Sequence, residues 1–284
     1  MPVDRIQPFL FEHLDLRGAV VVLEDTWQGL TRNRRYPAPV ARLLGEMSAV
    51  AALIAANLKQ PGRLTLQLRG EGPVSLLVLD CDEQLRLKGM ARWNEPVADT
   101  TAPVLLGHGH LLLNLDAAGM RQPYQSMVPL QGDRIAEIFE HYLSQSEQTP
   151  TRLILAASEH RAAGLFLQKL PNADARDADG WNRIQILAGT LRQEELLTLT
   201  PAALLARLFP EDDLRVFDPR PVTHHCPEDH DKIHAMLRSL GRAECEAILH
   251  DKGEVHVRDD LCNRDYRFDA AAIQALFEAA ARFH

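Results

Sequence analysis

The sequence predicts an α+β fold with a mixed sheet-and-helix N-terminal body, a helical linker and a small C-terminal domain. Apolar residues recur with helical spacing over residues 40–58. After Pro61-Gly62, the pattern changes to the alternation expected of strands, which predicts a three-strand meander over residues 64–90. A helix laid over such a meander buries an apolar face on both partners. A length of 284 residues with 46% hydrophobic content suffices for one large and one small domain.

The other elements of the N-terminal body follow from the same patterns. The β-branched run at 19–23 predicts a strand, and residues 134–143 have the spacing of a helix. Further strands are predicted at 152–156 and 163–170, and the polar segment 171–177 is expected to end this domain. The predicted body therefore covers residues 1–177.

A hairpin is predicted from strands at 104–106 and 111–115, joined around Gly107 and Gly109. His108 and His110 lie in this turn. Side chains at i and i+2 share a face of a strand, so the two imidazoles could bind one metal ion. The glycine neighbours and the lack of a third nearby ligand favour an exposed turn instead.

Residues 178–221 are predicted to form a helical linker between the body and a C-terminal domain at 222–284. Thr200-Pro201 is typical of a helix N-terminus. Two apolar stripes lie on either side of it: Ile184, Leu187 and Leu191, then Leu204, Leu205 and Leu208. These stripes either dock on the body or, when undocked, offer apolar surface to another protein.

Several segments resemble one known family in order along the chain. They are the helix-and-meander segment 43–80, Tyr124-Gln125, "SEQTPTR" at 146–152, "TLRQEELLTL" at 190–199 and "VFDPRPV" at 216–222. The chain is similar to the redox-regulated heat-shock chaperones called heat-shock protein 33. The resemblance implies an ATP-independent holdase, not an enzyme, that binds unfolded client proteins in the cytoplasm during stress. It also implies a linker that exposes apolar surface, and a homodimer on oxidation.

The C-terminal domain departs from the family's pattern. In the family, Cys-x-Cys and a later Cys-x-x-Cys supply four thiolates to zinc, and oxidation of each pair releases the metal and unfolds the domain. Here Cys226-Pro227-Glu228 and Asp259-Asp260-Leu261-Cys262 keep one cysteine of each pair. Neither near-neighbour disulfide can form, so the usual two-disulfide switch is expected to be absent.

Three alternatives remain for this site. Zinc could be bound by a mixed donor set of Cys226, Cys262 and nearby side chains, drawn from Glu228, Asp259, His225 and His256. The favoured alternative has no cofactor and a domain held by packing, with an apolar core of Tyr266, Phe268, Ile273, Leu276 and Phe277. The third is a redox-active disulfide between Cys226 and Cys262, which requires Cα atoms within about 7 Å.

The remaining cysteines and histidines carry weaker signals. Cys81 and Cys245 are each flanked by carboxylates, which disfavour a thiolate, so both are predicted to be inert and buried. The histidines at 224, 225, 230 and 234 could sense acid, although a solvated surface is favoured.

Composition limits the other functional classes. A net charge of −8 argues against a nucleic-acid partner, and no apolar run suggests a membrane partner. The N-terminal residues lack the pattern of a secretory signal, and four scattered cysteines fit a reducing cytoplasm. Two alternatives to a holdase are a metal-dependent enzyme using the Cys, His and acid cluster, and a regulatory module that binds a single partner.

Overall fold

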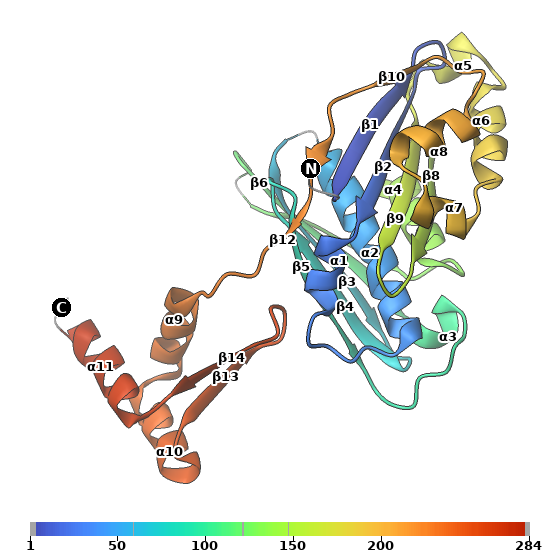
Figure 1. Cartoon of the computed structure of the whole chain (residues 1–284). Coiled ribbons are helices and arrows are strands. Elements are labelled where there is room, and N and C mark those ends of the chain that lie inside the picture. The colour runs from blue at the N-terminus through green and yellow to red at the C-terminus, as the bar shows by residue number, and fades with distance from the viewer. Residues whose placement is uncertain (1–3, 59, 121, 147, 282–284) are drawn as a thin grey trace. The chain divides into compact units, whose positions relative to one another are not determined.

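The computed structural model describes residues 4–58, 60–120, 122–146 and 148–281. The chain divides into two compact units, Met1–His225 and Cys226–His284 (Figure 1). Residues 178–221 therefore belong to the first unit. The mixed content of helices and sheets confirms the predicted α+β class.

The first sheet of the N-terminal unit has the strand order β10-β1-β2-β9-β8, with β11 also paired to β1. All of its pairings are antiparallel. Pro8 lies in β1 between the segments that pair with β10 and β11, where a missing N–H costs no ladder hydrogen bond. The strands are β1 (Arg5–Phe11), β2 (Leu16–Leu23), β8 (Thr151–Ala157), β9 (Ala162–Lys169), β10 (Leu214–Val216) and β11 (Arg220–Pro221).

The second sheet has the order β12-β5-β4-β3-β6-β7. The predicted meander is confirmed, because β3, β4 and β5 pair in sequence as antiparallel neighbours and Leu64, Leu66 and Leu68 are buried. The short strand β12 joins this sheet parallel to β5. The strands are β3 (Gly62–Gly70), β4 (Val74–Cys81), β5 (Arg86–Trp93), β6 (Gly109–Ala117), β7 (Tyr124–Pro129) and β12 (Thr223–His224).

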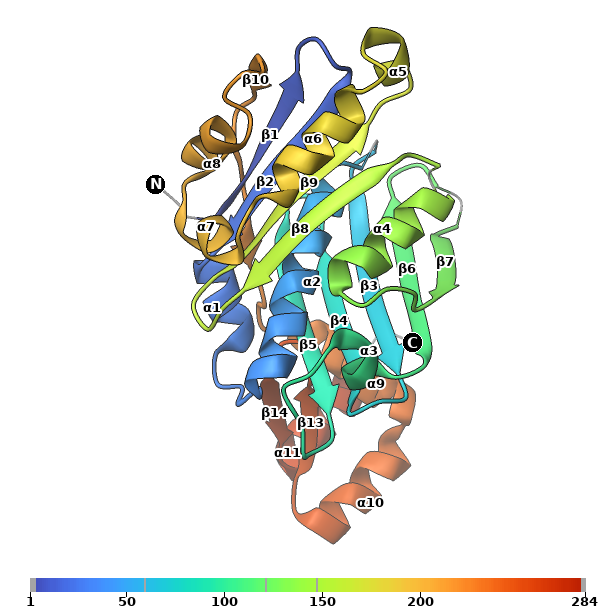
Figure 2. The same cartoon turned by 90° about the vertical axis from the view of Figure 1, so that its right-hand side faces the viewer.

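Helix α2 (Ala38–Ala56) lies between the two sheets and contacts strands of both (Figure 2). Small residues allow this close approach: a Cβ added at Gly45 would lie 2.6 Å from the Cβ of Ala157 in β8. Among the described residues, α2 is the one helix long and apolar enough to cross a membrane, and 72% of its most apolar window is buried within the protein. It is therefore the core helix that the sequence predicts.

The predicted strand at 104–106 is wrong. Those residues belong to the short helix α3 (Ala102–Leu106), because Pro103 occupies its first turn and Gly107, at φ 65°, ends it. β6 instead pairs with β3 and β7. Two further helices of this unit are α1 (Asp25–Thr31) and α4 (Ile135–Ser146), the latter close to the predicted 134–143.

Four helices cover the outer face of the first sheet: α5 (Ala173–Arg176), α6 (Gly180–Gly189), α7 (Gln193–Thr198) and α8 (Pro201–Leu208). Both predicted stripes pack there, against Phe9, Phe11 and neighbouring strand residues. The Thr200 hydroxyl accepts a hydrogen bond from the Ala203 N–H at 3.3 Å, so the predicted N-cap is confirmed. In this structure the stripes are docked.

The C-terminal unit is a small α+β fold built on the antiparallel hairpin of β13 (Val255–Asp259) and β14 (Arg264–Phe268). Its helices are α9 (His230–Leu240), α10 (Arg242–Lys252) and α11 (Ala270–Ala281). The predicted core residues Tyr266, Phe268, Ile273 and Leu276 are buried, and Phe277 packs against them. Ile233, Leu237, Cys245 and Val255 complete this core.

Candidate functional site: the paired cysteines of the C-terminal unit

Cys226 is the first residue of the C-terminal unit. It follows β12, whose segment is held to the second sheet by N–H groups of Thr223 and His225 that donate to the carbonyls of Leu85 and Leu87 at 3.2 and 3.0 Å. After Cys226, the Asp229 carboxylate caps α9 by accepting the Lys232 N–H at 2.9 Å. A strand and a helix cap thus fix the chain on either side of Cys226.

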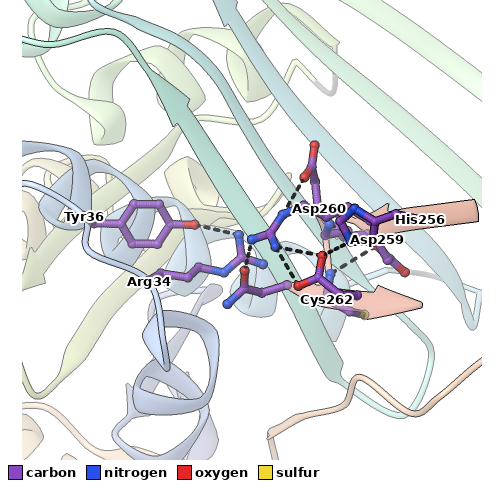
Figure 3. Close-up of polar contacts among 10 residues, drawn as sticks. Arg34, Tyr36, His256, Asp259, Asp260 and Cys262 are labelled. Carbon is purple, nitrogen blue, oxygen red and sulfur yellow. Dashed lines mark hydrogen bonds and ion pairs between the residues drawn. The ribbon is translucent and has the colours of Figure 1, made fainter. Parts of the chain in front are cut away.

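Cys262 lies in the loop between β13 and β14. The Asp259 carboxylate accepts the N–H groups of Leu261 and Cys262 at 3.0 and 3.2 Å, and Asn263 adopts a φ of 52°, a conformation that asparagine tolerates. Figure 3 shows His256, Asp259, Asp260 and Cys262 together on this hairpin. The loop is therefore ordered by its own side chains.

Cys226 and Cys262 are joined by a disulfide, with their Cα atoms 5.5 Å apart and a sequence separation of 36. This Cα distance lies within the limit of about 7 Å for a disulfide between these two cysteines, which was the third alternative for the site. Both residues are half-buried, so the bond is within reach of small thiols. The pairing joins one half of the first motif to one half of the second.

The two carboxylates that the resemblance aligns with family cysteines, Glu228 and Asp259, each face a cation of the protein. Glu228 forms an ion pair with Arg264 at 2.5 Å and lies 3.3 Å from the His230 imidazole. The other amino group of Arg264 donates to the Cys226 carbonyl at 2.8 Å. Asp259 lies 3.9 Å from the Lys232 ammonium. Sequence reasoning missed Arg264, although its position directly opposite Asp259 in the hairpin marks it as close to the site.

The predicted histidine ligands lie elsewhere or are already paired. His256 on β13 lies 2.7 Å from the Asp265 carboxylate, and this hydrogen bond, helped by Arg258, lowers the pKa of Asp265. His225 is an exposed residue at the end of the first unit. His108 and His110 are also exposed. Within the described ranges, no group of three or more His, Cys, Asp or Glu residues is arranged to hold a metal ion.

These donors do not fit a closed zinc site. Structural zinc requires deprotonated thiolates or free imidazoles in a tetrahedral set. Here the two sulfurs are bonded to each other, and the carboxylates are compensated by Arg264 and Lys232. A cation added beside Glu228 would meet the guanidinium of Arg264.

The two remaining cysteines are buried free thiols, as the sequence predicts. Burial, followed by Asp82 and Asp80, raises the pKa of Cys81. Burial, followed by Glu244 and Glu246, raises the pKa of Cys245. Both therefore remain protonated thiols at neutral pH, with little nucleophilic character.

Of the histidines considered as acid sensors, His224 has a perturbed environment. Burial, followed by the charges of Arg32 and Arg34, lowers its pKa. Arg34 itself donates to the Tyr36 hydroxyl at 3.1 Å (Figure 3). His224 is thus kept neutral near pH 7, and charging it in acid opposes the native structure.

A second feature lies in the N-terminal unit, where α8, β1 and β10 border an open groove of about 460 Å³. Its lining is mainly apolar and includes Leu205, Phe209 and Val216. Val216 and the adjacent Phe217 are 52% and 46% exposed. Exposed apolar side chains beside a groove are typical of an interaction surface.

Two sheets around a buried helix, followed by a small unit with paired cysteines, define a two-unit α+β protein with sulfur chemistry at its C-terminus. The chain belongs to the Hsp33 protein family, whose family model matches residues 4–269. The resemblance seen in the sequence is therefore confirmed.

Individual relatives support the same family assignment. The 33 kDa chaperonin of Methylobacillus flagellatus is 40% identical over 276 residues, covering 96% of this chain and 94% of that protein. The 33 kDa chaperonin of Pseudomonas aeruginosa is 40% identical over 285 residues, covering 98% and 95%. The crystal structure of the 33 kDa chaperonin from Thermotoga maritima matches with a TM-score of 0.85 over 98% of this chain and 99% of that chain. Its 22% identity makes it evidence for the fold.

Proposed function

We propose that this protein is an ATP-independent holdase that binds unfolding proteins and prevents their aggregation. Family membership over residues 4–269 carries this proposal, together with relatives called 33 kDa chaperonin that align over nearly their whole length. The proposed partners are unfolded clients, and the proposed compartment is the cytoplasm. We propose no cofactor, because the donor set around Cys226 does not fit zinc.

The groove beside β10 is the client surface that we propose for the structure with docked helices. Most of the linker stripe surface packs against the first sheet, and Leu205 is the stripe residue that also lines the groove. Val216 and Phe217 are exposed and lie on or beside the groove. Burying each of these side chains against an apolar client segment would contribute about 1.5 to 3 kcal/mol to binding.

The enzyme alternative has no support from the relatives, whose names describe a chaperonin. The cluster that suggested it consists of a disulfide and carboxylates already paired with cations. A single-partner module differs from a holdase in one measurable respect: it would not protect unrelated clients. Homodimer formation on oxidation remains a prediction, to be measured by sedimentation of oxidised and reduced protein.

The test is light scattering of two unrelated denatured enzymes diluted into buffer without nucleotide. The wild-type protein should suppress aggregation of both in a concentration-dependent way. Val216→Ser with Phe217→Ser should require at least roughly a hundred-fold more protein for the same protection, because two apolar contacts of about 1.5 to 3 kcal/mol each are lost. Met127→Ser, at a residue 66% exposed on β7, is the matched control and should behave as wild type. Failure to protect either enzyme would refute the holdase proposal.

A further inference from the structure

The Cys226–Cys262 disulfide encloses most of the C-terminal unit. It joins the first residue of that unit to the loop of its hairpin, so α9, α10 and β13 all lie within the closed segment. A cross-link across a segment of this kind reduces the number of conformations available to the unfolded chain, and so favours the folded unit. The bond therefore acts on the unit as a whole.

The apolar core of the unit is small. Its core consists of a few buried side chains: Ile233, Leu237, Cys245, Val255, Tyr266, Phe268, Ile273 and Leu276. A unit of this size buries a smaller fraction of its surface than a large domain does, and natural small domains often add a disulfide or a metal ion for stability. The C-terminal unit has residues that suggest either: Cys226 and Cys262 for a disulfide, and the nearby carboxylates for a metal ion.

Charge compensation around the disulfide argues against the metal. The carboxylates of Glu228 and Asp259 would be the oxygen ligands of a mixed site, yet Arg264 and Lys232 already face them. Arg264 also donates to the Cys226 carbonyl, so its positive charge occupies the region between the two motifs. A divalent cation there would be repelled by this guanidinium.

We infer that the Cys226–Cys262 disulfide, rather than a metal ion, holds the C-terminal unit closed, and that reduction by a dithiol is the step that opens the unit. In this step the S–S bond breaks, two electrons and two protons pass from the dithiol to the sulfurs, and the dithiol becomes a disulfide. A disulfide oxidant reverses the step by accepting the two electrons and two protons as the S–S bond re-forms, and the unit closes. This is the opposite sense to the oxidation-driven opening that the family resemblance implies.

The effect of the bond follows from the size of the loop. For a loop with a sequence separation of 36, the loss of loop-closure entropy favours the closed unit by on the order of 500-fold. Opening would expose the apolar core of the unit, including Leu237 and Phe268, to solvent. That the exposed surface then binds clients rests on the proposed holdase function.

Hydrogen–deuterium exchange on the full chain tests the inference. Adding a dithiol should speed exchange of the β13 and β14 amides on the order of 100-fold or more, while α2 amides stay unchanged as an internal reference. Cys226→Ser with Cys262→Ser should exchange at the fast rate with or without dithiol. Cys245→Ala, which removes a free thiol of the same unit, is the matched control and should keep the dithiol response. A thiol assay of denatured, unreduced wild type should find the two free cysteines, Cys81 and Cys245.

Two results would overturn the inference. One is unchanged exchange in the C-terminal unit after complete reduction, which would show that the bond does not hold the unit. Another is slow exchange restored to reduced protein by one equivalent of zinc, which would show a metal clamp. A chain that opens on reduction but protects no client in either state would support the disulfide lock and refute the holdase function.

Discussion

Replacing Glu46 with glutamine should stabilise the N-terminal unit at alkaline pH and have little effect in acid. Glu46 lies on α2, the helix between the two sheets. Burial raises the pKa of Glu46 from 4.5 to about 7, against the opposing charges of Arg42 and Arg134. The folded protein therefore binds this proton more tightly than the unfolded chain.

The sign and size of the effect follow from that difference. A carboxyl group with a raised folded-state pKa contributes stability that is fully present below pH 4.5 and is lost as the pH rises through 7. The full difference corresponds to about 3 kcal/mol. Glutamine is a close neutral analogue of the protonated acid and avoids this loss. At pH 8 the Glu46→Gln variant should be more stable by up to about 3 kcal/mol, or roughly 6 to 12 °C in Tm for a unit of this size.

The assay is urea unfolding at pH 4.5, 6, 7 and 8, followed by tryptophan fluorescence, since all three tryptophans lie in the N-terminal unit and Trp27 is buried in the same core. Glu137→Gln is the contrasting control. The hydrogen bond from Arg134 lowers the pKa of Glu137, so its stabilising contribution is present above its unfolded pKa and disappears in acid. Glu137→Gln should therefore slightly destabilise the N-terminal unit at pH 8. A constant difference between Glu46→Gln and wild type across this pH range would refute the reasoning.

Three further predictions concern other parts of the chain. A double-mutant cycle of Arg264→Ala and Glu228→Ala, read from unfolding of the C-terminal unit, should give a coupling of roughly 0.5 to 1 kcal/mol, since the pair is partly exposed; zero coupling would contradict a direct ion pair. His224→Asn should make the N-terminal unit less sensitive to acid below about pH 6.5, because a lowered histidine pKa means that stability is lost as the pH falls; an unchanged acid profile would contradict this. Gly45→Val should cost about 1 to 3 kcal/mol in urea unfolding, because its side chain would collide with Ala157; an unchanged midpoint would show that α2 and β8 can separate without loss.

The main fold could be predicted from the sequence because its signals are local. The 40–58 helix and the meander after it repeat their apolar residues at the periods of helix and strand, and the structure confirms both. The strand predicted at 104–106 failed because three apolar residues carry no period. Pro103 and Gly107 were the stronger signals there, for a helical turn. Strand β1 was missed because Pro8 interrupts it, and its tolerance depends on partners from 214–221 that no local pattern reveals.

The site was less predictable because it depends on distances between remote residues. The resemblance predicts that Glu228 and Asp259 stand in place of cysteines, but no local pattern reveals that each has a protein cation nearby. It left three alternatives for Cys226 and Cys262, and a Cα separation of 5.5 Å was needed to show that a single bond can join them. The raised pKa of Glu46 was likewise hidden, since a glutamate on a long helix ordinarily faces solvent.

The paired charges and the disulfide of the C-terminal unit together replace the stabilising role of a metal site. Replacing two cysteines of a four-sulfur zinc site with carboxylates would remove half of its thiolates and leave a weak set of metal ligands. Without the metal, the unit would lose its cross-link and each carboxylate would need a cation of the protein nearby. Arg264 and Lys232 compensate the carboxylates, and the two remaining sulfurs supply a covalent cross-link. Because a disulfide opens on reduction whereas a thiolate–zinc clamp opens on oxidation, the same replacement that removes the metal also reverses the direction of the redox response.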